Sequence, residues 1–234
     1  MAQVRVGTSG FSYDEWKPSF YPEQLKKDGF LAYYASRFAT VEVDRTFYRM
    51  PNAKTLDAWR AATPDGFRFA IKASQKITHF EKLAVPSEAL AYLVRILAGF
   101  EDRLGAVLFQ LPPVLRKDLE RLGKFLEALP EGLPSAFEFR HAAWLDEEAY
   151  DLLRRRGAGL VIHDADEGTT PLVVTGRLAY LRLRKTSYSP EEFAAWRERA
   201  RVWAAGGVDV YMYVKHEDNP DAPRIALDLA GGLA

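Results

Sequence analysis

Residues 67–72 read Phe-Arg-Phe-Ala-Ile-Lys, a short segment in which apolar and charged side chains largely alternate. Side chains on a β-strand point to opposite faces in turn, so such a segment has one apolar face and one ionic face. The same alternation recurs at residues 41–44 (Val-Glu-Val-Asp), 137–140 (Phe-Glu-Phe-Arg) and 181–184 (Leu-Arg-Leu-Arg). Charged side chains on the second face of such strands require an enclosed interior in which they contact each other or a ligand. A closed barrel has such an interior.

Eight strand candidates occur along the chain, and amphipathic helical patterns separate most of them. We expect strands at residues 4–7, 40–44, 67–72, 106–111, 136–140, 160–163, 179–184 and 208–215. We expect helices at residues 24–38, 53–62, 87–100, 117–129, 146–155, 190–205 and 223–229, whereas residues 164–171 read as a loop without a helix. Strands that alternate with helices indicate parallel βαβ units. Eight such units predict an α/β fold, a single-domain (β/α)₈ TIM-like barrel over residues 1–234. An open doubly wound sheet is the rival, but the chain lacks the Gly-rich dinucleotide fingerprint.

The composition excludes several classes of protein. Lysine plus arginine and aspartate plus glutamate both number 32, so there is no global basic field of the kind that a nucleic-acid coat protein needs. The chain has no cysteine, which removes disulfides, thiolate nucleophiles and cysteine-based zinc sites. No apolar run approaches the ~20 residues of a membrane span, and the first residues do not resemble a signal peptide. We therefore expect a cytoplasmic protein with no membrane partner. The sequence gives no indication of oligomeric state.

If the apolar strand faces point toward the helices, the other set of side chains lines the barrel interior. This set contains Arg5, Glu42, Arg68, Lys72, Gln110, Glu138, Arg140, His163, Arg182, Arg184, Tyr211, Tyr213 and Lys215. Its members at strand ends, with Asp44 and Asp164, should form a rim, because the active sites of such barrels lie at the carboxyl ends of the strands. Basic groups outnumber acidic ones here, and enclosed cations are costly unless an anion or solvent reaches them. The pattern favours a small anionic ligand that carries phosphate or carboxylate.

Two other roles remain open for the inward charges. Glu42, Glu138 and the arginines can pair with one another as a structural network that fills the barrel. Two inward carboxylates are also the residue types that serve as an acid/base pair or as ligands of a hard metal ion. The choice depends on the separation of the side chains, which the sequence does not give.

The histidines and the first loop offer further candidates. The runs His163-Asp164-Ala165-Asp166 and His216-Glu217-Asp218 resemble metal-ligand clusters only loosely, so a divalent metal is possible but not favoured. His141 either anchors its loop or acts as a general acid/base, a role that suits a side chain titrating near neutral pH. Phe11, Tyr13 and Trp16, in the loop after the first strand, either stack on a sugar or base or pack the barrel mouth.

Several ordered motifs carry a family resemblance. They are Gly7-Thr8-Ser9-Gly10-Phe11, Thr40-Val41-Glu42-Val43, residues 46–51, residues 67–72, Phe109-Gln110-Leu111-Pro112-Pro113, Glu138-Phe139-Arg140-His141 with Trp144, and Tyr180-Leu181-Arg182. Over almost its full length the chain resembles the YecE-like family, domain of unknown function 72. The resemblance implies a TIM-like barrel without an established activity. Its motif positions here are Glu42, Tyr48, Lys72, Gln110, Glu138, Arg140, Trp144 and Arg182. Lys215 and His216 stand where many members carry asparagines.

The leading hypothesis is an enzyme, a hydrolase or isomerase, that binds an anionic, phosphate-bearing or sugar-like substrate at the rim. In it Arg140, Arg182, Arg184 and Lys72 hold the anion, while Glu42, Glu138 or His141 transfers a proton. Gln110 contacts the substrate, and Tyr48 and Trp144 wall it. One alternative is metal-assisted nucleic-acid binding or processing, which the neutral net charge disfavours. The other is a non-catalytic ligand-binding or adaptor protein.

Overall fold

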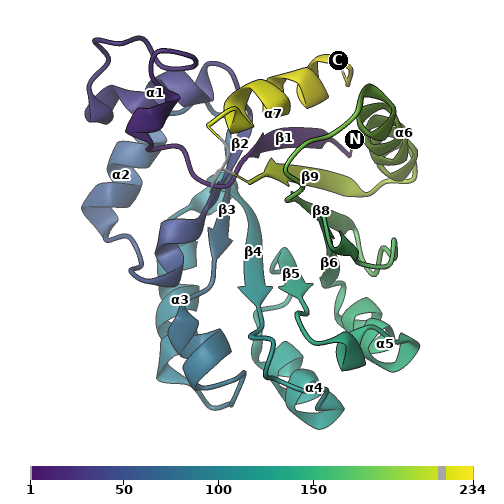
Figure 1. The fold of residues 1–234 in the computed structure, drawn as a ribbon. Helices are drawn as coiled ribbons and strands as arrows, with labels where there is room; N and C mark the ends of the chain where they lie inside the picture. The colour runs from purple at the N-terminus through teal and green to yellow at the C-terminus, as the bar shows by residue number, and fades with distance from the viewer. Residues whose placement is uncertain (1, 216–219, 234) are drawn as a thin grey trace.

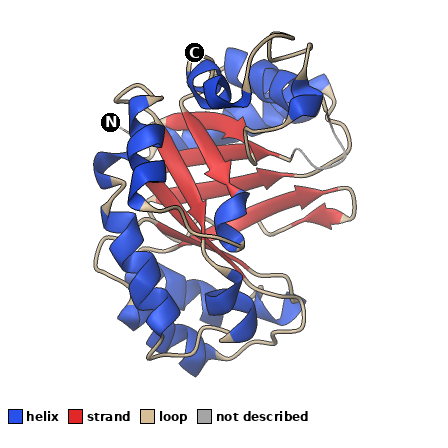
Figure 2. Ribbon diagram, turned by 90° about the vertical axis from the view of Figure 1, so that its left-hand side faces the viewer, coloured by secondary structure: helices blue, strands red, loops and turns tan. Residues whose placement is uncertain are grey.

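The computed structural model describes residues 2–215 and 220–233, and within them eight parallel strands surround a central axis (Figure 1). The parallel strands are β1 (Val4–Thr8), β2 (Thr40–Val43), β3 (Arg68–Lys72), β4 (Leu104–Gln110), β5 (Ser135–Glu138), β6 (Gly159–Ala165), β8 (Leu178–Leu183) and β9 (Asp209–Val214). Each overlaps one of the eight predicted strands. Their carboxyl ends gather on one side of the molecule, and helices cover the outside of the sheet (Figure 2). The predicted single-domain (β/α)₈ TIM-like architecture is confirmed.

The sheet runs in the order β1-β9-β8-β6-β5-β4-β3-β2 and almost closes between its two ends. At this seam Ser9 and Glu42 form a parallel bridge, and the Gly10 N–H donates to the Glu42 carbonyl at 2.7 Å. Gly7 makes the approach of β1 to β2 sterically feasible, because a Cβ at this position would lie 2.3 Å from the Thr40 carbonyl oxygen. The seam therefore places the end of β1 directly beside the end of β2.

The described residues contain seven α-helices, of which the first six lie between strands and the last follows β9. They are α1 (Phe30–Ala35), α2 (Ala53–Ala61), α3 (Glu88–Ala98), α4 (Leu119–Ala128), α5 (Glu147–Arg156), α6 (Pro190–Ala205) and α7 (Ala222–Gly231). Short helical turns lie at Asp14–Trp16, Lys27–Gly29, Asp44–Phe47, Lys76–Phe80, Glu101–Arg103 and Ala142–Trp144. The helix expected at residues 24–38 is much shorter, because Tyr21 packs flat on Phe30 at 4.1 Å and draws the preceding chain into an aromatic cluster. No helix in the described residues is long and apolar enough to cross a membrane.

The connection after β6 has no helix, as predicted. It folds back as β7 (Gly168–Thr169), which pairs antiparallel with the end of β6. Asp164 is buried there, accepts a hydrogen bond from the Thr169 hydroxyl at 2.5 Å and one from the Trp196 indole at 3.2 Å. Asp164 therefore points outward to α6, and its expected place at the rim is wrong. Successive strand residues face opposite sides, so it cannot share the face of its neighbour His163.

Two layers of side chains fill the barrel interior. The lower layer is apolar and contains Ala70, Ala106, Leu108, Ala136, Val161, Leu178, Tyr180, Tyr211 and Tyr213. The upper layer is ionic and lies at the carboxyl ends of the strands. Period-two alternation is confirmed, since the intervening Phe69, Ile71, Phe137 and Leu181 belong to the separate outer core beneath the helices. The middle of the interior is thus apolar, Arg5 lies over the Tyr211 ring at 5.4 Å toward the amino ends of the strands, and the ionic layer lies where a TIM-like barrel presents its functional end.

Candidate functional site

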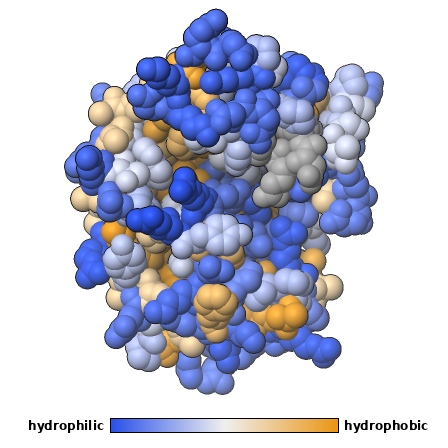
Figure 3. Space-filling view, turned by 60° about the vertical axis from the view of Figure 1, so that its left-hand side comes forward, coloured by the Kyte–Doolittle hydropathy of each residue, from blue (hydrophilic) through white to orange (hydrophobic). Residues whose placement is uncertain are grey.

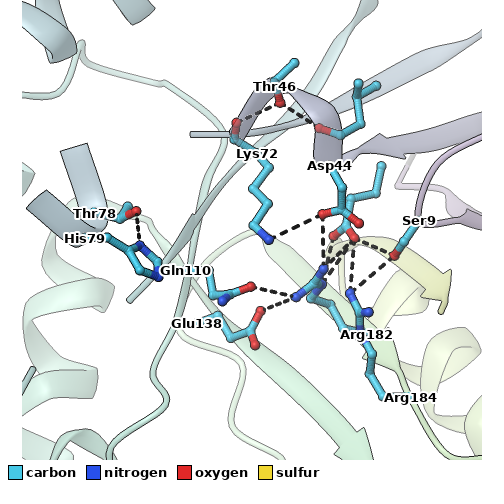
Figure 4. A network of polar contacts seen from close by, with 12 residues as sticks. Ser9, Asp44, Thr46, Lys72, Thr78, His79, Gln110, Glu138, Arg182 and Arg184 are labelled. Carbon is cyan, nitrogen blue, oxygen red and sulfur yellow. Dashed lines mark hydrogen bonds and ion pairs between the residues drawn. The ribbon is translucent and has the colours of Figure 1, made fainter. Parts of the chain in front are cut away.

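Arg182 of β8 is the centre of the ionic layer (Figure 4). Its Nε donates to Glu42, its Nη1 donates to Glu138 at 2.7 Å and to the Gln110 side-chain oxygen at 3.1 Å, and its Nη2 donates to Glu42 at 2.8 Å and to Asp44 at 3.3 Å. A guanidinium has five N–H donors in a fixed plane, and these partners occupy all of them. Arg182 therefore ties β2, β4, β5 and β8 together and has no donor left for an incoming anion.

Glu42 of β2 is fully buried and accepts hydrogen bonds from several elements. Besides Arg182, the Ser9 hydroxyl donates to it at 2.5 Å and the Tyr180 hydroxyl at 2.6 Å. Burial acts to raise the pKa of Glu42, but Arg182 and Arg184 outweigh it and lower the pKa to about 2. Glu42 is consequently ionised at physiological pH and anchors the layer.

Glu138 of β5 is the second buried carboxylate, and Arg140 forms an ion pair with its Oε1. Burial acts to raise the pKa of Glu138, yet the charges of Arg182 and Arg140 hold it below its usual range. His163 faces the same group. Burial is the main cause of a lowered His163 pKa, and together with the nearby Arg140 and Arg184 it outweighs the opposing effect of Glu138 and brings the pKa to about 4. His163 is therefore neutral at physiological pH.

Asp44 is the carboxyl group of this layer that opens toward solvent, with 23% of its side chain exposed. Lys72 of β3 lies 3.6 Å from it, and Arg182 lies 3.3 Å from the same oxygen. Burial and then the Glu42 carboxylate raise the pKa of Asp44, against the opposing charges of Arg182 and Lys72. Asp44 also lines a large surface cavity, so it joins the buried layer to the outside.

Arg184, just beyond β8, is the least satisfied cation of the layer. Its side chain is only 8% exposed, and its Nη2 reaches Ser9 at 3.4 Å and Glu42 at 3.5 Å. Its Nε–H has no hydrogen-bond partner among the described residues. A buried donor without a partner costs free energy that a bound acceptor recovers. Burial and the adjacent Arg182 both lower the pKa of Arg184, because both disfavour its positive charge.

The structure brings most of the predicted site residues together. Glu42, Lys72, Gln110, Glu138, Arg140, Arg182 and Arg184 share the mouth of the barrel. Four cations, Lys72, Arg140, Arg182 and Arg184, here face three carboxylates, Glu42, Asp44 and Glu138, which leaves one excess positive charge within this group of residues. Much of the layer is also a structural ion network, as the alternative interpretation expected.

Three predicted site residues lie apart from this layer. Trp144 does not wall a substrate, because it is fully buried, stacks on Phe139 at 4.8 Å and donates its indole N–H to the Leu115 carbonyl at 2.8 Å. His141 caps a short helical turn by accepting the Ala143 N–H at 3.1 Å, which is the anchoring role. Tyr48 is 74% exposed and belongs to the surface cavity.

The other candidates from the sequence mainly have packing roles in the structure. Trp16 is fully buried, and Tyr13 packs on it at 4.9 Å, so this part of the first loop packs the barrel mouth. His163 and Asp164 point to opposite faces and do not form a metal cluster. Across residues 2–215 and 220–233, no group of three His, Asp or Glu side chains could hold a metal ion. His216-Glu217-Asp218 lies outside the described residues.

Sequence reasoning missed two partners of Glu42, namely Ser9 and Tyr180. Tyr180 precedes Arg182 by two residues and so shares its strand face, a signal that alternation contained. Ser9 gives no such signal, because it lies beyond β1 and reaches Glu42 only through closure of the barrel.

Comparison with known proteins identifies the family. A sequence model described as "Protein of unknown function DUF72" matches residues 5–234. The chain belongs to the DUF72 family. It is 30% identical to a DUF72 family protein of Thermotoga maritima MSB8, whose crystal structure covers 99% of both chains with a TM-score of 0.82. A DUF72 family protein from Enterococcus faecalis V583, at 20% identity and covering 99% of this chain and 95% of its own, has a TM-score of 0.79 and supports the fold alone.

Curated relatives of this DUF72 protein carry no assigned activity in their names. UPF0759 protein YunF of Bacillus subtilis is 27% identical over 156 residues, which are 63% of this chain and 54% of YunF. UPF0759 protein YecE of Escherichia coli K12 is 30% identical over 138 residues, which are 56% of this chain and 51% of YecE. The chain thus spans about half the length of the curated relatives that it matches. The expected family is confirmed.

Proposed function

We propose that this DUF72 protein is an enzyme that binds a small anionic substrate in the barrel mouth, above Arg182. The observation that carries this proposal is the Arg184 side chain, which is more than nine-tenths buried and has an unpartnered Nε–H. A phosphate or carboxylate group satisfies that donor and balances the excess positive charge of the layer.

The cations at the barrel mouth have two roles in this proposal, namely organising the site and binding the anion. Arg182 organises the site, because its donors are already occupied. Arg184 and the partly exposed Arg140 hold the anion, and Lys72 lies opposite them beside Asp44. A phosphate placed here neutralises Arg184 without competing with the buried Arg182–Glu42 contact.

Asp44 is the proton-transfer group in this proposal. A general acid or base works best when its pKa lies near the working pH and when it reaches the substrate. Glu42 meets neither requirement, since its pKa of about 2 is far below the working pH and its burial keeps it from the substrate. Asp44 is partly exposed, and its pKa is raised. Proton transfer beside a bound phosphate suits hydrolysis or isomerisation of a phosphorylated, sugar-like substrate.

Thermal denaturation with inorganic phosphate and pyrophosphate tests the anion site. A ligand at 100 times its dissociation constant stabilises by about 2.7 kcal/mol, or roughly 5–10 °C for a domain of this size. We expect that shift in the wild type and in Arg155→Met, an exposed arginine of α5, and its loss in Arg184→Met. Absence of any shift in the folded wild type refutes the anion site and leaves the layer as a structural network.

Turnover tests the enzymatic part. Phosphorus NMR of a panel of sugar phosphates incubated with the protein detects either phosphate release or isomerisation. We expect Asp44→Asn to abolish the turnover while it keeps the thermal shift with inorganic phosphate. Equal turnover by Asp44→Asn and the wild type excludes Asp44 as the proton-transfer group.

A further inference from the structure

A groove runs outward from the barrel mouth between the loop after β2 and helix α3. It encloses about 1370 Å³ and is lined by the loops after β1, β2 and β3 and by faces of α2 and α3. Small-molecule pockets usually occupy about 300–1,000 Å³, so this groove exceeds what a sugar phosphate fills. On the side of the molecule where α2 and α3 come forward, hydrophilic side chains surround a hollow (Figure 3).

Four cations line the groove, and none of them forms an ion pair with another described residue. They are the exposed Arg45, Arg49, Lys76 and Arg95, whereas the carboxylates that line the groove are two, Asp44 and Glu88. Elsewhere on this neutral chain, exposed basic residues commonly lie beside a carboxylate, as Arg154 lies 2.6 Å from Asp151. The groove is therefore a local positive region, and the amino ends of α2 and α3 at its edge add to that potential.

Aromatic rings are exposed on the same groove. Tyr48 is 74% exposed, and Phe47 packs edge-on against its ring at 5.0 Å. Tyr92 of α3 is 43% exposed, and the Arg95 guanidinium lies over its ring at 5.2 Å. A solvent-exposed ring beside an unpaired arginine is the arrangement in which single-stranded nucleic acid binds, with bases on the rings and phosphates on the cations.

We propose that this groove binds a short single-stranded nucleic acid. Tyr48 and Tyr92 stack on bases, and Arg45, Arg49 and Lys76 contact successive phosphates. The inference goes beyond the proposed function and does not depend on it, because none of these residues contacts Arg184 in the described structure. Asp44 lines the groove and also belongs to the ionic layer. A nucleic acid bound in the groove therefore leads toward the barrel mouth.

Fluorescence anisotropy with a labelled oligothymidylate of ~10 nucleotides tests this inference. Three phosphate contacts predict that log K falls with log salt at a slope of about −2. Loss of one stacked base predicts that Tyr48→Ala weakens binding roughly 5- to 150-fold, and Tyr48→Phe keeps it. Arg49→Ala should reduce the slope by about 0.7, whereas Arg155→Ala, outside the groove, should change neither quantity.

Four outcomes overturn the inference. They are no binding by the wild type at low salt, equal binding by Tyr48→Ala and the wild type, equal affinity for a duplex of the same sequence, and full displacement of the strand by polyglutamate at equal charge concentration. The last result indicates an acidic protein partner instead. Arg184→Met distinguishes the two proposals, since we expect it to lose the phosphate shift and to keep oligothymidylate binding.

Discussion

Replacing Glu42 by glutamine tests how much the ionic layer stabilises the fold. The substitution keeps the size of the side chain and one acceptor oxygen, for either the Ser9 or the Tyr180 hydroxyl, but it removes the charge that faces Arg182. A buried cation then loses its main partner, and breaking such a pair commonly costs about 3–5 kcal/mol.

The pKa of Glu42 gives an independent magnitude. It falls from an ordinary 4.5 to about 2 on folding, and a difference of 2.5 units corresponds to about 3 kcal/mol. Because folding lowers this pKa, the stabilisation is fully present above pH 4.5 and is lost as the pH falls toward 2. The free energy of unfolding of Glu42→Gln should therefore lie about 3 kcal/mol below the wild type at pH 7, and only about 1.4 kcal/mol below it at pH 3.

Urea denaturation of both proteins at pH 7, 4 and 3 measures these differences. Glu120→Gln is the matched control, because Glu120 is exposed on α4 and, among residues 2–215 and 220–233, pairs only with Lys124 at 2.6 Å. Its effect should stay within about 0.5 kcal/mol at every pH. A cost of Glu42→Gln under about 1 kcal/mol at pH 7, or an equal cost at pH 3 and pH 7, contradicts a stabilising charge on Glu42.

Three further predictions concern other parts of the fold. Trp144→Phe should destabilise by about 1–3 kcal/mol through loss of the indole hydrogen bond to Leu115, and an unchanged urea midpoint contradicts this. Gly7→Ala should cost at least about 1–3 kcal/mol, because its methyl group meets the Thr40 carbonyl at the seam; a stable variant with unchanged spectra shows that the seam can open freely. The His163 imidazole should titrate near pH 4 by NMR, so the unfolded chain binds the extra proton and His163 makes stability rise with pH between about 4 and 6.5. A measured His163 pKa near 6.5 contradicts its burial between the arginines.

Much of the fold followed from alternation and helical periodicity. The segment at residues 67–72 became β3 with Phe69 and Ile71 in the outer core and Lys72 at the mouth, as predicted. The helix at residues 190–205 was predicted at its observed bounds, and in the structure Ser189 and Glu192 form a capping box at its start. The first helix was too long in the prediction, because the stacking of Tyr21 on Phe30 depends on tertiary packing that local periodicity does not contain.

The site was predictable in its members but not in their roles. Strand faces placed Glu42, Glu138 and Arg182 together, yet only the distances show that Arg182 is saturated and that Arg184 is not. Trp144 occupies a position of a family motif. The sequence does not distinguish a ring that lines a ligand site from one that packs in the core. That distinction rests on how the loop after β5 folds back on Leu115.

The most direct test of the anion site is NMR of the arginine Nε–H groups during a titration with inorganic phosphate. The Arg184 signal is assigned by its loss in Arg184→Lys, and the Arg182 signal serves as an internal reference, because Glu42 already holds its Nε–H. We expect phosphate to shift the Arg184 Nε–H signal and to slow its exchange with water, while the Arg182 signal stays in place. An Arg184 signal that does not move while the protein remains folded shows that phosphate does not bind at Arg184.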